Sequence, residues 1–210
     1  MKDLFDAVLG ARRTVGDDEL PAGAAKVIAI TRTYPYEIDD VWSALTEPER
    51  LSRWLAPIAG ELQVGGTYQL EGNAGGEIRV CEPPERLQVT WNLGDAGPAD
   101  ASLVEVVLEA VDDGATRLTL QHRAVVPPDM WDQFGPGAVG IGWDLSLLGL
   151  HAHLAGFEVP NEAEPDAPLR EFLASSSSRW GDAFAESGVA ADVVAAAVAG
   201  STAFYVPPER

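Results

Sequence analysis

The fold is decided at residues 26–55, which read KVIAITRTYPYEIDDVWSALTEPERLSRWL. Residues 27–34 are rich in β-branched and aromatic side chains and predict a strand, which Pro35 ends. The spacing of an amphipathic helix follows, carried by Ile38, Val41, Trp42 and Leu45. Residues 46–49, Thr-Glu-Pro-Glu, then predict an N-cap with proline early in a second short helix. The main body is therefore expected to begin with one strand and two short helices.

A run of short alternating segments comes next. Apolar residues alternate at Leu62 and Val64, Tyr68 and Leu70, Ile78 and Val80, Leu87 to Trp91, Val104 to Leu108, and Leu118 to His122. Turn-forming residues separate these segments, and residues 72–76 predict a hairpin tip. Short alternating strands joined by tight turns indicate an antiparallel sheet with one buried face.

The C-terminal third is predicted to be helical. A long helix from about residue 139 to 157 is apolar over more than half of its circumference, so we expect it to be largely enclosed. Residues 160–168 form an acidic, proline-rich linker, and two helical patterns follow at 169–186 and 189–204. The last helix is poor in charge and should either cover the core or form a dimer seam.

We expect three segments. Residues 1–24 form an N-terminal arm, consisting of a short amphipathic piece and a polar link. Residues 25–160 form the main domain. Residues 161–210 form a helical extension that packs on the core or on a partner copy.

The central body resembles the activator-of-Hsp90-ATPase-like (AHSA1-like) branch of the Bet v 1/START (SRPBCC) superfamily. The likeness runs from about residue 30 to 157 and rests on five pieces in order. These are residues 41–51 with Trp54, residues 64–68, residues 82–87 with Thr90 and Trp91, residues 116–120, and Gly142-Trp143 with Leu147-Leu148. The arm before Lys26 and the helices after Pro168 lie outside the common pattern.

The resemblance implies an α+β helix-grip fold, in which a curved antiparallel sheet wraps around a long C-terminal helix. It also implies an internal hydrophobic cavity. It does not imply one chemistry, because this fold hosts carriers, cyclases, hydrolases and partner-binding modules.

Composition narrows the function classes. The 210 residues hold 14 Lys and Arg against 33 Asp and Glu, a net charge of −19. That balance argues against binding to nucleic acid and against docking on an anionic membrane. No apolar run reaches the length of a membrane span, and the N-terminus lacks the pattern of a signal peptide. We expect a cytoplasmic protein.

The candidate ligand-binding residues are those expected to face the cavity. They are Trp54, Tyr68, Leu70, Ile78, Trp91, Leu120, His122, Trp143, Leu147 and Arg32. His122 shares the inward parity of Leu118 and Leu120, and could be a general base, a polar ligand contact or a structural histidine. Arg32 shares the parity of Ile28 and Ile30, and would pair with Asp144 or a ligand anion, or reach water at the sheet's end.

No catalytic set, metal site or cofactor site is predicted. His151 and His153 point apart on a helix and cannot chelate one metal together. Residues 135–140 match GxGxxG, but no parallel strand precedes them and Pro136 removes a donor, so we expect a hinge that could gate a cavity. The single Cys81 is out of parity with Ile78 and Val80 and beside Glu82, and is not expected to be a nucleophile.

Three functions remain open. The first is binding of a small hydrophobic, aromatic or lipid-like ligand in the cavity. The second is a cyclase- or hydrolase-type enzyme that uses Arg32, Asp144 or His122 in the same cavity. The third is a co-chaperone-like or regulatory module, whose acidic surface would favour a basic partner.

Overall fold

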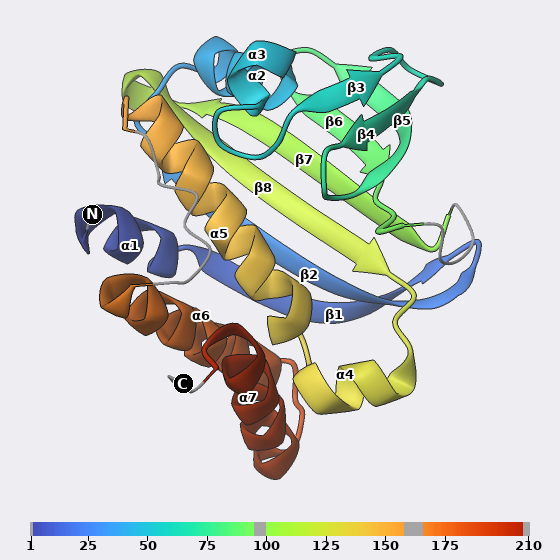
Figure 1. Ribbon diagram of the computed structural model, residues 1–210, viewed down its shortest axis with the longest axis vertical. Coiled ribbons are helices and arrows are strands. Elements are labelled where there is room, and N and C mark those ends of the chain that lie inside the picture. The colour runs from blue at the N-terminus through green and yellow to red at the C-terminus, as the bar shows by residue number, and fades with distance from the viewer. Residues whose placement is uncertain (1, 95–99, 158–165, 208–210) are drawn as a thin grey trace.

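One curved sheet of eight antiparallel strands forms the body of the protein, and a long helix lies across its concave face (Figure 1). The computed structural model describes residues 2–94, 100–157 and 166–207. The strand order is β1-β2-β8-β7-β6-β5-β4-β3. The strands are β1 (Arg12–Leu20), β2 (Gly23–Tyr34), β3 (Ile58–Gly60), β4 (Thr67–Leu70), β5 (Gly75–Glu82), β6 (Arg86–Thr90), β7 (Ser102–Val111) and β8 (Ala115–Ala124).

Seven α-helices complete the described part of the chain. They are α1 (Lys2–Leu9), α2 (Ile38–Thr46), α3 (Pro48–Leu51), α4 (Pro128–Phe134), α5 (Gly137–Leu154), α6 (Ala167–Glu186) and α7 (Ala191–Tyr205). A 3-10 turn at Asp112–Gly114 joins β7 to β8. Helices α2 and α3 close one end of the sheet, and α6 and α7 lie on the far side of α5 (Figure 1). None of the helices described is long and apolar enough to cross a membrane.

The expected α+β helix-grip architecture is confirmed, including the two short helices, the antiparallel sheet and the long helix. Helix α5 is enclosed as predicted, because the sheet covers one side and α6 and α7 cover the other. Its buried apolar side chains are Ile141, Trp143, Leu147, Leu148 and Leu150. The hairpin tip at residues 72–76 is confirmed in part, since β4 ends at Leu70 and β5 begins at Gly75.

The polar link predicted within residues 1–24 is wrong. Residues 12–20 form the edge strand β1, which pairs with β2 from Arg12 opposite Thr31 to Leu20 opposite Gly23. Its sequence, RRTVGDDEL, has no continuous apolar alternation, because most of its side chains are at least partly exposed. Charged side chains on an edge strand also discourage pairing with other chains.

Three further predictions need correction. Residues 62–64 are not a strand, and Leu62 and Val64 are 43% and 58% exposed. The helix predicted for residues 139–157 begins at Gly137 and ends at Leu154, which leaves Phe157 exposed. A short helix that the sequence did not predict, α4, lies between β8 and α5. Most of the predicted linker at residues 160–168 lies outside the described residues.

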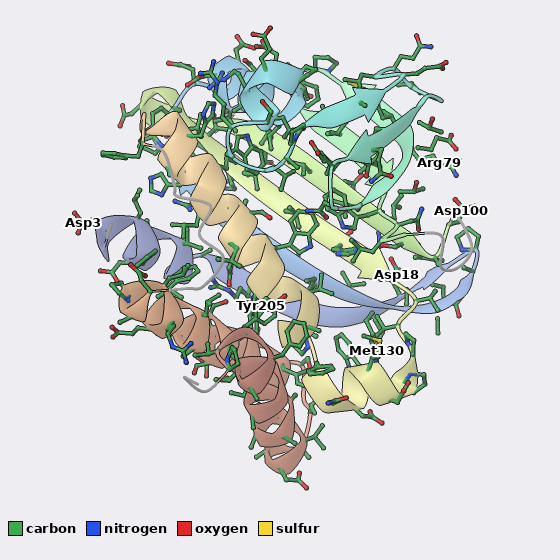
Figure 2. The ribbon with its side chains drawn as sticks, viewed as in Figure 1. Asp3, Asp18, Arg79, Asp100, Met130 and Tyr205 are labelled. Atoms are coloured by element: carbon green, nitrogen blue, oxygen red, sulfur yellow. The ribbon has the colours of Figure 1, made fainter. Side chains whose placement is uncertain are left out.

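The glycines of the GxGxxG match are packing positions, and the hinge prediction is wrong. Gly137 and Gly140 lie in the first turns of α5. A Cβ at Gly140 would collide with the indole of Trp180 from α6, and one at Gly137 would lie 2.6 Å from Ser201 Oγ of α7. Tyr205, labelled in Figure 2, extends from α7 toward the start of α5. Its hydroxyl donates to the carbonyl of Ala138 at 2.8 Å. These close contacts fix the start of α5 against α6 and α7.

Candidate functional site

A partly enclosed cavity of about 160 Å³ lies between the concave face of the sheet, the α2–α3 end and α5. The structure brings eight of the ten candidate residues to its wall: Trp54, Tyr68, Leu70, Ile78, Trp91, Leu120, Trp143 and Leu147. The wall also contains residues that were not among the ten predicted ligand-binding candidates. These are Leu45, Thr46, Leu51, Leu55, Ile58, Leu62, Gln63, Cys81, Leu87, Val89, Val104, Val106, Leu118 and Ser146.

Strand alternation places most of this wall. Inward residues of neighbouring strands lie opposite one another, as Val106 does to Leu120 and Val89 to Val104. Because side chains on a strand alternate between faces, these residues share one side of the sheet. The other wall comes from α5 and from Trp54, which follows α3. The rim includes Leu62 and Gln63, which are both exposed.

The polar atoms of three aromatic wall residues are already bonded within the protein. The hydroxyl of Tyr68 donates to the carbonyl of Thr90 at 2.8 Å. Nε1 of Trp54 donates to the carbonyl of Ala44 at 2.9 Å, and Nε1 of Trp143 donates to Nδ1 of His122 at 3.0 Å. Burial raises the pKa of Tyr68 well above its ordinary value, so this phenol stays neutral. These residues therefore offer the cavity mainly apolar ring surface.

Trp91 differs from the other two tryptophans in the wall. Its ring lies 4.9 Å from that of Trp143, centroid to centroid, at an interplanar angle of 49°. Within the described part of the chain, its indole N–H makes no hydrogen bond. Trp91 thus combines an aromatic surface in the cavity wall with an indole N–H that has no acceptor among the described residues.

Cys81 lines the cavity because of a bulge in β5. The register with β6 shifts between Ile78 and Val80, so that Ile78 lies opposite Val89 and Cys81 lies opposite Leu87. The bulge reverses the alternation, and it brings Cys81 to the same face as Ile78. The parity argument that separated Cys81 from Ile78 is therefore wrong. Nothing in the sequence marks the extra residue.

His122 faces inward, as its parity predicted, but it lies behind the cavity wall and does not line the cavity. Its Nδ1 accepts from Trp143, and its Nε2 lies 2.8 Å from Oγ of Ser102. Because an indole N–H can only donate, the ring proton of neutral His122 sits on Nε2. Burial lowers the pKa of His122 to about 4. In this tautomer Nε2 cannot take the proton of Ser102, so the pair is not poised as a nucleophile and base.

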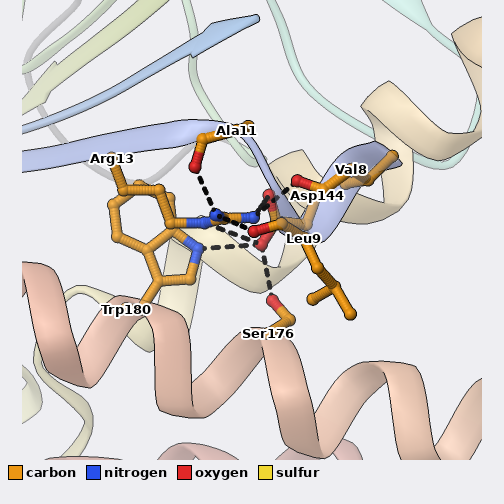
Figure 3. Close-up of polar contacts among 7 residues, drawn as sticks. All are labelled: Val8, Leu9, Ala11, Arg13, Asp144, Ser176 and Trp180. Carbon is orange, nitrogen blue, oxygen red and sulfur yellow. Dashed lines mark hydrogen bonds and ion pairs between the residues drawn. The ribbon is translucent and has the colours of Figure 1, made fainter. Parts of the chain in front are cut away.

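Arg32 also lies outside the cavity, and the predicted pairing of Arg32 with Asp144 is wrong. The partner of Asp144 is Arg13, whose Nη2 lies 2.9 Å from Oδ1 in a fully buried ion pair (Figure 3). Ser176 and Trp180 of α6 donate to the same carboxylate at 2.6 and 3.1 Å. Asp144 thus joins β1, α5 and α6, and it is not available to a ligand.

The three polar residues on which the enzyme hypothesis depends do not meet in the cavity. Neither Arg32, Asp144 nor His122 lines the cavity. His151 and His153 bond to different arginines, Arg32 and Arg50, as their opposed directions predicted. The described residues contain no cluster of His, Cys, Asp or Glu side chains that could hold a metal ion.

The comparisons with known proteins agree with the observed fold. Residues 35–155 match the family model "Activator of Hsp90 ATPase homolog 1-like protein". The crystal structure of CalU16 from Micromonospora echinospora is 32% identical, with 86% of this chain and 99% of that chain covered and a TM-score of 0.67. The comparison with curated proteins gives no match.

Two more distant structures share the fold alone. PFC0360w, described as an Hsp90 activator from Plasmodium falciparum, is 24% identical, with 62% of this chain and 96% of that chain covered and a TM-score of 0.54. DynU16, described as a putative protein in the dynemicin biosynthetic locus, is 22% identical, with 61% of this chain and 47% of that chain covered and a TM-score of 0.54.

Proposed function

The chain belongs to the Activator of Hsp90 ATPase homolog 1-like family, and we propose that it binds a small hydrophobic molecule, aromatic or lipid-like, in the cavity between the sheet and α5. One observation carries this proposal. The cavity is walled almost wholly by apolar and aromatic side chains, and the polar atoms of Trp54, Tyr68 and Trp143 are bonded elsewhere. An apolar ligand gains the burial of its surface there without leaving wall groups unpaired.

The volume sets the size of the buried group. Empty apolar cavities of about 150 Å³ accommodate a benzene-sized molecule. A cavity of about 160 Å³ therefore suits one aromatic ring or the end of an acyl chain. A larger ligand would extend past the exposed rim residues Leu62 and Gln63. The free N–H of Trp91 would select ligands with one acceptor among otherwise apolar groups.

PFC0360w is described as an Hsp90 activator, but we do not transfer this function to the present chain, because 24% identity supports only a common fold. The described surface offers no observation that favours a chaperone partner over a small molecule.

The test uses N-phenyl-1-naphthylamine, a neutral fluorescent probe, together with indole, naphthalene and decanol as competitors. Val89→Trp fills the cavity from β6. Val107→Trp makes the same change on the neighbouring strand β7, where alternation with Val104 and Val106 places residue 107 on the opposite face. We expect saturable binding by the native protein and by V107W, and at least a tenfold loss of affinity in V89W.

Two outcomes would overturn the proposal. One is that neither the probe nor any competitor binds at concentrations up to its solubility limit. The other is that V89W, shown to be folded by circular dichroism, binds the probe as well as V107W does.

A further inference from the structure

Arg32 carries a buried positive charge that forms no ion pair within the described part of the protein. Its side chain extends from β2, and the residue is 8% exposed. Nη2 of Arg32 lies 3.0 Å from Nδ1 of His151 on α5, while Nε and Nη1 are buried without a hydrogen-bond partner. None of the ion pairs among the described residues includes Arg32. Two buried donors of a charged group are thus left unsatisfied, an arrangement that is costly unless a further partner binds.

Arg13, on the same face of the sheet, is a buried arginine whose guanidinium is fully hydrogen-bonded. It lies one strand away, on β1, and is 7% exposed. Its guanidinium donates to the carbonyls of Val8, Leu9 and Ala11 and to both carboxylate oxygens of Asp144 (Figure 3). Arg32 has the same burial but neither the carbonyls nor the carboxylate. The contrast identifies what is missing at Arg32, namely oxygen acceptors with negative charge.

The neighbours of Arg32 fit an anion. The guanidinium carbon lies 4.2 Å from the centre of the Tyr34 ring. The hydroxyl of Tyr34 is buried and makes no hydrogen bond of good geometry, although Arg32 is close enough to oppose the rise that burial gives the pKa of Tyr34. Nδ1 of His151 accepts from Arg32, so the N–H of neutral His151 is on Nε2. Burial and the charge of Arg32 both lower the pKa of His151. Near neutral pH the imidazole is therefore uncharged and adds no second positive charge beside Arg32. The hydroxyl of Tyr34 can therefore donate to an anion, whereas Nδ1 of His151 faces Arg32 as an acceptor.

We propose that Arg32 and Tyr34, next to His151, form a binding site for a small oxyanion, a carboxylate or a phosphate group, separate from the apolar cavity. The planar guanidinium presents paired N–H groups that match such oxygens in number and direction. The site lies between β2 and the C-terminal turns of α5, whereas the cavity wall includes none of these three residues. An anion bound there would accept hydrogen bonds from Arg32 and balance its charge, as Asp144 does for Arg13.

The experiment measures thermal unfolding in sodium acetate and in sodium phosphate, each compared with sodium chloride at equal ionic strength. A ligand that binds only the folded protein raises the midpoint in a saturable way. We expect acetate, phosphate or both to raise the midpoint of the native protein above the chloride value. The anion that saturates at the lower concentration identifies the source as carboxylate or phosphate.

Arg32→Met tests the residue, and Arg123→Met is its matched control. Arg123 lies on β8 and also has a buried Nε without a partner, but it is already paired with Asp18 and Glu105. We expect R32M to lose the anion effect and R123M to retain it. In the absence of acetate and phosphate, R32M should be at least as stable as the native protein, because an unpaired buried charge has been removed.

The proposal is overturned if acetate and phosphate act like chloride on the native protein, or if R32M responds as R123M does. A second measurement serves if R32M does not fold. In the native protein, the ring ¹H and ¹⁵N signals of His151 should shift on addition of the stabilising anion, while those of His153 should stay unchanged. Unchanged His151 signals would equally overturn the proposal. Neither result bears on the apolar cavity, because the neutral naphthylamine probe reports on that site independently.

Discussion

Nε1 of Trp143 donates a hydrogen bond to Nδ1 of His122 at 3.0 Å, so a residue in the cavity wall fixes the tautomer of a histidine behind it. The bond does two things. It directs the polar edge of the indole away from the cavity, and it places the histidine proton on the nitrogen that faces Ser102. The same contact therefore makes the wall apolar and prevents His122 from acting as a base toward Ser102.

The burial of His122 leads to a prediction about pH. His122 has a pKa of about 4 in the folded protein, against about 6.5 when unfolded. The unfolded chain therefore binds the proton more readily between these values. The stability that neutral His122 contributes is fully present above about pH 6.5 and is lost as the pH falls toward 4. The loss should be on the order of 3 kcal/mol.

Urea unfolding of the native protein and of His122→Gln, each at pH 7 and pH 4.5, checks this. Other titrating groups are common to both proteins, so the difference between them isolates His122. We expect the native protein to lose more stability than H122Q on acidification. An equal loss in both proteins would show that His122 does not have the lowered pKa.

The buried ion pair of Arg13 and Asp144 predicts a strong dependence on both partners. Burial raises the pKa of Asp144, although Arg13, Ser176 and Trp180 oppose that shift. Arg13→Met leaves the carboxyl group without its counter-charge and should cost about 3–5 kcal/mol. The double variant R13M/D144L removes both charges and should regain most of that loss. Urea unfolding measures both, and a double variant no more stable than R13M would contradict the argument.

Gly140 and Gly142 on α5 form a matched pair for testing helix packing. A Cβ at residue 140 would meet the indole of Trp180, whereas one at residue 142 would lie 3.5 Å from the Tyr205 hydroxyl, an ordinary contact. Gly140→Ala should destabilise the protein by about 1–3 kcal/mol through overpacking. Gly142→Ala should be neutral or stabilising by up to about 1 kcal/mol, since alanine favours helix. Thermal unfolding of the two variants distinguishes the outcomes, and equal midpoints would refute the close contact.

Cys81 provides a chemical probe of the cavity, because it is the only cysteine in the chain and lies in the wall. Reaction with N-phenylmaleimide should be slower in the folded protein than in urea. It should be slower still after the cavity is filled by Val89→Trp, because Val89 lies two residues along β6 from Leu87, the residue opposite Cys81. Mass spectrometry follows the rate. An unchanged rate in V89W, with V107W as control, would place the thiol outside the cavity.

The sequence placed most of its ten candidate residues correctly in the cavity wall, because strand alternation and helix spacing are local properties. Val104 and Val106, or Leu118 and Leu120, face one side whatever surrounds them. The resemblance over residues 30–157 then placed these faces around the long helix. Eight of the ten candidate residues reached the cavity for this reason.

The residues that the sequence misplaced depend on single events of tertiary packing. A bulge of one residue moved Cys81 inward. The edge strand β1 has few buried side chains and is held by its pairing with β2. This strand places Arg13 next to Asp144, so Asp144 pairs with Arg13 and not with Arg32. The GxGxxG glycines acquired their role from Trp180 and Ser201, which lie more than 35 residues further along the chain.

The sequence by itself determined the antiparallel sheet, the two short helices and the enclosed long helix, because the hydrophobic periodicity of strands and helices is a local property of the sequence. Only the tertiary structure decided which charged and polar groups meet. Arg13 and Arg32 both point inward from neighbouring strands, yet Arg13 pairs with the carboxylate of Asp144 whereas Arg32 contacts the imidazole of His151. Such pairings depend on distances between segments far apart in the chain, which no local pattern contains.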